Sequence, residues 1–314
     1  MSLRRIDVHT HFVPDFYRDA LIEAGHERPD GIARIPGWDV RTALRTMDEL
    51  GVATAFLSIS SPGIHFGDDQ AARLLSRRVN EEAAQLCAGH PGRFGFFASL
   101  PVPDIEGALA EAAHAFDELG ADGVVLETNH HGHYLGDDLY RPLYAELDRR
   151  AATLFVHPTS PLCAAGPTLD CPRPMLEFMF DTTRSVTDMV LSGALEQHPG
   201  LRVIVPHAGA ALPVLAGRVD LMSEISGADV PGLRDALSRL YFDVAGAPVP
   251  ELLTALRSVA RPGHVFYGSD WPFTPAPVAV ELGRRLAGTD RLSDDERVAV
   301  FEGNARRFFP RLQK

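Results

Sequence analysis

The sequence IDVHTH at residues 6–11 predicts a short β-strand that runs directly into two histidines. Side chains alternate between the two faces of a strand, so His9 and His11 point the same way while Thr10 points the other way. Neutral imidazole is the commonest metal ligand, and two imidazoles on rigid backbone form half of a site for zinc or a similar divalent ion. Histidine pairs at this spacing also occur by chance in cores and on surfaces, so the pair alone does not distinguish a metal site from structural histidines.

The composition is that of a globular protein with a small-molecule partner. Of the 314 residues, 45% are hydrophobic and 23% are charged, which excludes disordered and fibrous classes. No linker or low-complexity tract divides the sequence, and its length suits one large α/β domain, so we expect residues 1–314 to form a single domain. A formal net charge of -12 argues against binding to nucleic acid or to an anionic membrane, because both need a positive surface.

Lysine and cysteine usage narrows the chemistry further. Lys314 is the only lysine, which excludes Schiff-base enzymes, phosphate-loop nucleotide binding and two-metal sites bridged by a carbamylated lysine. The cysteines are odd in number and lack metal-ligand spacing: Cys87, Cys163 and Cys171. We therefore expect free thiols in a reducing cytoplasm rather than disulfides. We expect no secretion, because Arg4 and Arg5 lead directly into the first strand, and no apolar run approaches the roughly 18 residues of a membrane span.

Apolar runs and helical periodicity alternate along the whole chain. After the first strand, residues 12–38 show no sustained period, which predicts a long insertion there. Helical spacing follows at 39–50, 69–88 and 104–119, around Leu143, from about 174 to 195, and at 294–309. Seven further strands are predicted at 52–58, 94–99, 123–127, 153–157, 201–205, 241–244 and 265–268. Eight buried strands that alternate with helices predict a (β/α)8 barrel. The alternative, an open doubly wound sheet, lacks its glycine-rich first turn.

Catalytic groups of such barrels lie at the C-terminal ends of the strands. The residues at these predicted strand ends are all of types that bind metal or transfer protons. Several separate strands rarely end in histidine or aspartate by chance. This pattern favours a metal site over chance. The residues are His9, His11, Glu127, His157, His207 and Asp270.

At these residues the sequence resembles the amidohydrolase superfamily. Its metal and catalytic motifs match, in order, DVHTH at 7–11, VHP at 156–158, HAG at 207–209 and GSDWP at 268–272. Further segments are similar to the amidohydrolase-2 branch, which includes aminocarboxymuconate semialdehyde decarboxylase and the decarboxylases of γ-resorcylate and 6-methylsalicylate. These segments are NE at 80–81, HPGRF at 90–94, ASLP at 98–101, FDTTR at 180–184 and GNA at 303–305.

The resemblance implies one divalent metal per chain, usually zinc and sometimes manganese. Its ligands would be His9, His11, His157 and Asp270, with a water molecule completing the shell. His207 would stand beside that water as acid or base. The chemistry of the residues agrees, because three neutral imidazoles leave a zinc ion strongly Lewis-acidic and the carboxylate can ligate it or carry a proton.

Weaker assignments concern the substrate. Arg218 lies where the aminocarboxymuconate enzyme places an arginine that reaches the substrate carboxylate of a neighbouring subunit, which implies a homodimer; otherwise it is a solvated helix arginine. Arg34 corresponds loosely to a substrate arginine of the first long loop; the alternative is an arginine without a role in substrate binding. Trp271, together with Phe12, Phe66, Phe180 and Phe273, is expected to form an aromatic pocket wall or to pack in the core.

Two further groups have competing interpretations. Glu127 is either a second-metal ligand or a hydrogen-bonding partner of a metal-bound histidine. The run HHGH at 130–133 is interpreted as a loop over the barrel mouth, since no partner carboxylate or strand fixes His130, His131 or His133.

The function predicted from these residues is the non-oxidative decarboxylation of an aromatic or unsaturated carboxylic acid. PTSP at 158–161 replaces the tryptophan-containing loop of the aminocarboxymuconate enzyme, which favours salicylate-like substrates over muconates. A lactone or amide hydrolase with the same ligands, with Asp270 as base, is the main alternative. A catalytically silent metal-binding protein is disfavoured because no motif position is altered.

Overall fold

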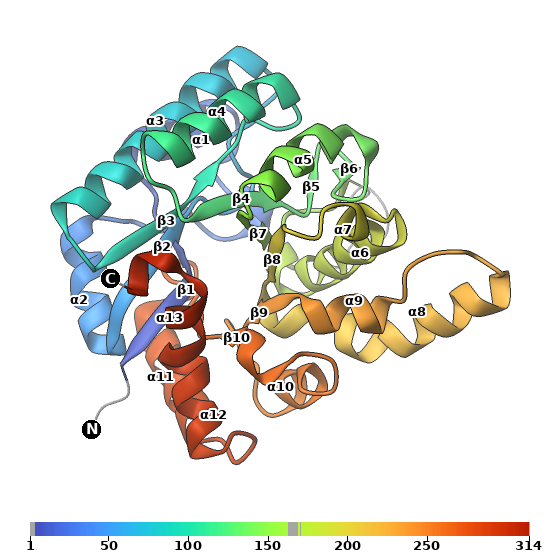
Figure 1. The fold of residues 1–314 in the computed structure, drawn as a ribbon. Coiled ribbons are helices and arrows are strands. Elements are labelled where there is room, and N and C mark those ends of the chain that lie inside the picture. The colour runs from blue at the N-terminus through green and yellow to red at the C-terminus, as the bar shows by residue number, and fades with distance from the viewer. Residues whose placement is uncertain (1–3, 163–168, 170, 314) are drawn as a thin grey trace.

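The computed structural model describes residues 4–162, 169 and 171–313, so Cys163 and Lys314 lie outside the described residues. Eight strands form one sheet in the order β1-β2-β3-β4-β7-β8-β9-β10, and each neighbouring pair is parallel. The first and last strands also meet, because Val8 N donates to Tyr267 O at 3.0 Å and His11 N donates to Trp271 O at 2.8 Å. The predicted (β/α)8 barrel is therefore confirmed (Figure 1).

All eight predicted strands are present, with small differences at their ends. A separate antiparallel hairpin, β5–β6, follows β4 and was not predicted. The strands are β1 (Arg5–His11), β2 (Val52–Ser58), β3 (Phe94–Ser99), β4 (Gly123–Glu127), β5 (Asn129–His130), β6 (His133–Tyr134), β7 (Thr153–His157), β8 (Arg202–Val205), β9 (Tyr241–Asp243) and β10 (Val265–Phe266).

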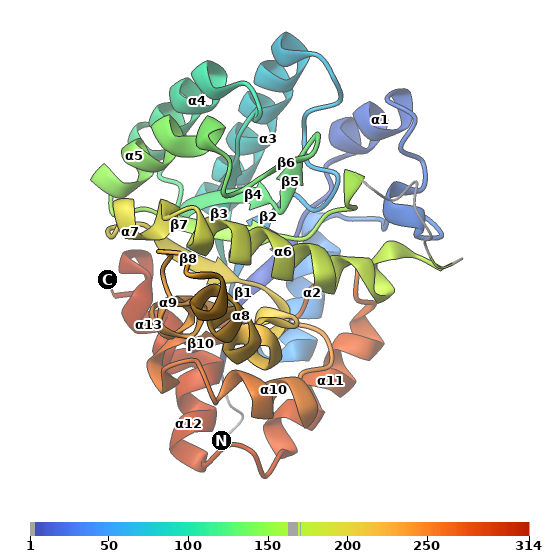
Figure 2. The same cartoon turned by 90° about the vertical axis from the view of Figure 1, so that its right-hand side faces the viewer.

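The helices surround the strands, and Figure 2 shows α6, α8 and α10 on the face turned towards the viewer. None of the helices in the described part of the chain has the length and apolar character needed to cross a membrane. The helices are α1 (Asp15–Glu23), α2 (Val40–Leu50), α3 (Asp69–Gly89), α4 (Ile105–Asp117), α5 (Arg141–Arg149), α6 (Glu177–Leu191), α7 (Ala194–Gln197), α8 (Leu212–Ser226), α9 (Leu233–Arg239), α10 (Glu251–Leu256), α11 (Ala276–Gly288), α12 (Asp294–Val298) and α13 (Asn304–Phe308).

Three helical predictions need correction. The segment between β1 and α2 contains α1, which sequence patterning missed because only Tyr17 and Leu21 of this short helix are buried; the insertion at this place stays a prediction. The helix predicted up to residue 195 is broken at Gly193, whose φ of 73° interrupts helical geometry between α6 and α7. The C-terminal helix is continuous but contains a π-helical turn at Ala299–Gly303.

A cluster of apolar side chains fills the interior of the barrel at the end that the C-terminal segment covers. The C-terminal segment closes that end: the Phe309 ring stacks on Phe56 at 4.1 Å, and Arg202 at the start of β8 donates to Phe308 O at 3.2 Å. The cluster separates the polar residues at the C-terminal ends of the strands from solvent at this closed end. The members from the strands are Ile6, Val8, Phe56, Phe97, Val125, Phe155, Ile204 and Phe266.

A bulge in β1 decides where its histidines point. Pairing with β2 shifts between Asp7 and Thr10, which oppose Ala55 and Leu57, so β1 holds one extra residue there. Val8 belongs to the inner apolar cluster, and the His9 ring lies 5.0 Å from Phe155 of that same cluster. Strict alternation would send His9 outwards, so the bulge re-aims it into the barrel.

Candidate active site

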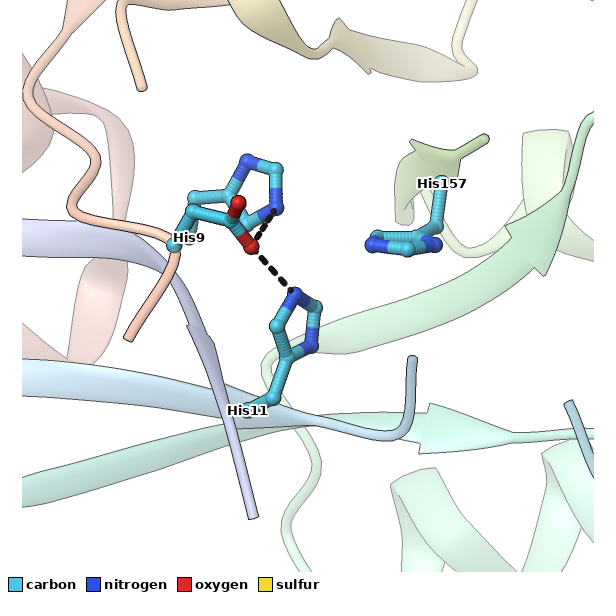
Figure 3. A group of neighbouring side chains, drawn as sticks. His9, His11 and His157 are labelled. Carbon is cyan, nitrogen blue, oxygen red and sulfur yellow. Dashed lines mark ion pairs between the residues drawn. The ribbon is translucent and has the colours of Figure 1, made fainter. Parts of the chain in front are cut away.

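Three histidines and one aspartate converge at the C-terminal end of the barrel. His9 and His11 come from β1, His157 ends β7, and Asp270 follows β10. Each offers one ligand atom, and these atoms all lie within 4.8 Å of one another. Asp270 Oδ1 is 3.5 Å from His9 Nε2 and 3.3 Å from His11 Nε2, and Figure 3 shows the three imidazoles gathered around this point. The structure thus brings together the four residues predicted to ligate a metal.

Backbone contacts hold Asp270 against the first strand. Its N–H donates to His9 O at 2.8 Å, and Thr274 N donates to Asp270 O at 2.8 Å. Asp270 has a φ of 58°, in the left-handed region that costs a non-glycine residue about 1–3 kcal/mol. The surrounding contacts maintain this turn, which places the carboxylate beside the two histidines of β1.

The donor atoms fit a divalent metal ion. Nε2 of His9 and Nε2 of His11 are buried without a hydrogen-bond partner, although an unsatisfied buried polar group costs about 1–3 kcal/mol. Three imidazole nitrogens and one carboxylate oxygen form a donor set suited to zinc and similar ions. A His/Asp metal site is therefore present, and a bound divalent ion would satisfy both nitrogens.

Two of the three imidazoles are in the protonation state that such an ion needs, while on the third a bound ion would displace a proton. Burial lowers the pKa of His11 and lowers the pKa of His157 well below its usual value, so both imidazoles are neutral and have a lone pair to donate. For His9, burial lowers the pKa, but the Asp243 carboxylate outweighs burial and raises it to about 9. Burial raises the pKa of Asp270, yet the imidazoles of His11 and His207 hold it well below its usual range.

His207 lies beside this cluster without belonging to it. Its Nε2 is 4.0 Å from Asp270 Oδ2, and its ring centroid is 5.0 Å from that of His9. It is not one of the four residues whose ligand atoms converge. His207 has a φ of 54° and Ala208 a φ of 56°, so this turn is strained as well.

A cavity of about 830 Å³ opens beside this cluster of three histidines and Asp270. His157, His207 and Asp270 lie in its wall, as do two residues predicted to bind substrate, Arg34 and Trp271. A pocket of this size with mainly apolar walls and a few converging polar groups is typical of a small-molecule site. The other lining residues include Asp30, Met175, Phe178, Met179, Ala247, Leu252 and Phe273.

The sequence matches the model of a known protein family over almost its whole length. The model of the family described as amidohydrolase matches residues 6–311. The chain belongs to this amidohydrolase family. The resemblance to its decarboxylase branch is also confirmed by the relatives described next.

Relatives of this amidohydrolase cover nearly its full length. A 6-methylsalicylic acid decarboxylase from Aspergillus aculeatus is 38% identical over 99% of this chain and 97% of its own. A gamma-resorcylate decarboxylase from Rhodococcus jostii is 28% identical over 86% of this chain and 87% of its own. The solved structure of an amidohydrolase II superimposes with a TM-score of 0.93 at 35% identity, over 99% of this chain and 100% of the other.

Not every predicted substrate residue of the amidohydrolase lines the cavity. Arg218 is exposed on α8 and lines a separate groove, so its role in a neighbouring subunit stays a prediction. Of the predicted aromatic wall, only Trp271 and Phe273 line the cavity. Phe12 is buried against Trp38 in the outer core, Phe66 lines another cavity, and Phe180 is 46% exposed.

The histidines after β4 have partners that the sequence analysis did not foresee. His130 Nε2 is 2.9 Å from Glu127 Oε2, and His133 Nδ1 is 2.9 Å from Asp137 Oδ2. His131 Nε2 is 2.9 Å from His65 Nδ1. The statement that nothing fixes these histidines is therefore wrong, because carboxylates and the β5–β6 hairpin hold them. Glu127 is not a member of the ligand group found among the described residues.

Sequence analysis also missed two buried carboxylates. Asp243 ends β9, and its Oδ2 lies 2.9 Å from His9 Nδ1. Asp7 Oδ1 accepts from the backbone N–H groups of His9 at 3.1 Å and Ser269 at 3.0 Å, and burial raises the pKa of Asp7 to about 7. A signal for Asp243 was available, because it is a carboxylate next to the end of the strand predicted at 241–244, where catalytic groups of barrels lie.

Proposed function

We propose that this amidohydrolase is a metal-dependent decarboxylase of an aromatic, salicylate-like carboxylic acid. The observation that carries the proposal is its 38% identity, over nearly the whole of both chains, to a 6-methylsalicylic acid decarboxylase. The cavity supports it, since its polar groups converge at one end while Trp271, Phe273 and Phe178 offer apolar surface for a ring.

His9, His11, His157 and Asp270 would hold one divalent ion, zinc or manganese. When bound, the ion supplies Lewis-acid charge that stabilises the negative charge developing in the substrate. Arg34 and Trp271 would bind substrate: the guanidinium at the cavity wall attracts a carboxylate, and the indole packs against the ring. The partner is therefore a small carboxylate.

The reaction exchanges a carboxyl group for a proton. The bond between ring carbon and carboxylate breaks, CO2 leaves, and the electron pair stays on the ring carbon until a proton arrives there. Asp270 and His207 are the proposed proton-transfer groups, since Oδ2 of one lies 4.0 Å from Nε2 of the other and both line the cavity. Transfer by positioned groups of this kind contributes about 100- to 10,000-fold.

A hydrolase with the same residues would open a lactone or cleave an amide, with Asp270 as base. Both reactions can be assayed with one preparation. We expect purified protein to release CO2 from at least one of 6-methylsalicylate, γ-resorcylate or a related hydroxybenzoate. Turnover of lactones or amides without any CO2 from the acids would replace the decarboxylase assignment.

The purified protein is expected to contain about one zinc or manganese per chain, because one closed ligand set is present. Elemental analysis measures the content. A chelator should abolish activity and lower the thermal midpoint modestly, since the barrel has its own apolar core. Two metals per chain, with Glu127 as an additional ligand, would overturn the mononuclear assignment.

We further propose a homodimer, a single domain over residues 1–314 and a cytoplasmic location. The dimer rests on Arg218, which lines no part of the active-site cavity of its own chain and would serve the neighbouring one. Free thiols at Cys87 and Cys171 agree with a reducing compartment.

Replacing Arg218 tests the dimer. We expect Arg218→Ala to raise KM for the carboxylate substrate by about 10- to 100-fold, as loss of a charge-assisted hydrogen bond of roughly 1.5–3 kcal/mol implies. The control is Arg257→Ala. Arg257 directly follows α10, pairs with Glu296 and does not line the cavity. If the protein is a monomer at micromolar concentration, or if Arg218→Ala has the KM and kcat of the wild type, Arg218 does not bind the substrate of a neighbouring subunit.

A further inference from the structure

Asp243 lies at the centre of the contacts that hold the active-site histidines. Its side chain is fully buried at the end of β9. One carboxylate oxygen, Oδ2, is 2.9 Å from His9 Nδ1. The other, Oδ1, accepts from the backbone N–H groups of His207 at 3.1 Å and Ala245 at 2.9 Å. A single side chain therefore contacts both a residue of the metal site and the backbone of the proposed proton-transfer residue.

The contact with His9 determines which ring nitrogen carries the proton. An ionised carboxylate can only accept a hydrogen bond, so Nδ1 of His9 is the donor. In the neutral ring, Nε2 then keeps its lone pair, and this nitrogen lies 3.5 Å from Asp270 Oδ1 among the converging ligand atoms. Partners of this kind orient ligating histidines, and their loss typically weakens metal affinity about 10- to 100-fold.

The contact with His207 supports a strained turn. His207 and Ala208 are consecutive non-glycine residues with φ values of 54° and 56°, a conformation that persists only where neighbouring groups maintain it. Asp243 Oδ1 holds the first N–H of this turn. Because the turn is fixed, the His207 imidazole stays beside the cluster, with Nε2 4.0 Å from Asp270 Oδ2.

We propose that Asp243 is a positioning residue that keeps His9 Nε2 free for the metal and holds His207 at the reacting end of the cavity. The inference rests on the proposed function, in which His9 ligates the ion and His207 transfers a proton. The competing account gives Asp243 a purely structural role, as a buried acceptor between β1, β9 and the turn after β8.

Asp243→Asn separates these accounts. Its amide oxygen can still accept from His207 and Ala245, while its NH2 group faces His9 Nδ1 as a donor. His9 would then carry its proton on Nε2, the nitrogen that a metal needs free. The matched control is Asp122→Asn, because Asp122 has a 7% exposed side chain and also accepts a backbone N–H, that of Phe96, outside the cavity.

The first measurement is manganese retention by manganese-loaded protein against a chromogenic chelator. We expect Asp243→Asn to bind manganese about 10- to 100-fold more weakly than the wild type. At saturating manganese its kcat should recover towards the wild-type value and KM should change little, because the amide oxygen still accepts from the His207 N–H and the cavity residues Arg34 and Trp271 are unchanged. Asp122→Asn should match the wild type in both respects.

The second measurement is the side-chain ¹⁵N NMR spectrum of the metal-free proteins, in which the two ring nitrogens report where the proton sits. At a pH above about 9, where the His9 ring is neutral, the wild type should show it protonated on Nδ1 alone, and Asp243→Asn should show it protonated on Nε2 alone. Unchanged tautomer and manganese affinity within about twofold of the wild type would overturn the inference. Failure of the proposed function is seen separately, as a wild type that releases no CO2, whereas the tautomer test needs no turnover.

Discussion

His157→Ala is expected to lose metal and activity together. The imidazole is 2% exposed, and burial lowers its pKa well below the usual value, which favours the neutral ring with a lone pair to donate. Partners that merely orient a ligand change affinity about 10- to 100-fold, so removing a ligand should leave at most about a tenth of the wild-type metal after dialysis. Elemental analysis and CO2 release on the same sample measure the two losses.

The control for this experiment is His133→Ala, which removes a histidine whose side chain is 49% exposed on the β5–β6 hairpin. It should retain metal and activity. Circular dichroism and the thermal midpoint establish that His157→Ala is folded, and His157→Asn provides a second variant of smaller volume change. A folded His157→Ala with full metal content would contradict the ligand assignment.

His207→Ala should separate metal binding from chemistry. His207 is outside the four-residue ligand group but 4.0 Å from Asp270 Oδ2. We expect metal content near that of the wild type and a fall in kcat of about 100- to 10,000-fold, the usual contribution of a general acid or base. Metal analysis and steady-state kinetics with the best hydroxybenzoate are the measurements.

His264→Ala is a matched control, since this partly buried histidine contacts Leu240 O and the Tyr241 ring away from the cavity. Its kcat should equal that of the wild type. If His207→Ala loses its metal, His207 is a ligand rather than a proton-transfer group. If it keeps both metal and full activity, Asp270 alone transfers the proton.

The barrel could be predicted because local pattern and global fold agree in this chain. The buried runs at β2, β3 and β4 are continuous and apolar, as parallel strands covered by helices require. The helix predicted at 39–50 is α2, where the Asp39 side chain caps the first turn and Gly51 ends the helix in the left-handed conformation. The convergence of His9, His11, His157 and Asp270 could also be predicted, because the strand ends of a barrel meet in space.

The rest depended on tertiary contacts that leave little trace in one sequence. Alternation along 6–11 places His9 and His11 on one face, but the bulge that aims them inwards exists only through pairing with β2. The left-handed turns at His207 and Asp270 are held by hydrogen bonds that their N–H groups donate to the Asp243 carboxylate and to His9 O of β1. These positions are occupied by residues other than glycine, so the sequence carries no signal for a left-handed backbone there. The backbone strain at the site could therefore not be predicted.

The central claim is that a proton replaces the carboxyl group at the carbon that bore it, and turnover in D2O tests this directly. With 6-methylsalicylate, the account predicts CO2 and 3-methylphenol that carries one deuterium at the vacated ring position, identified by NMR. Product incubated with the enzyme in D2O controls for exchange after release. His207→Ala should form this product about 100- to 10,000-fold more slowly. Failure of the metal-loaded wild type to release CO2 from any hydroxybenzoate, together with hydrolysis of a lactone or amide, would contradict the account.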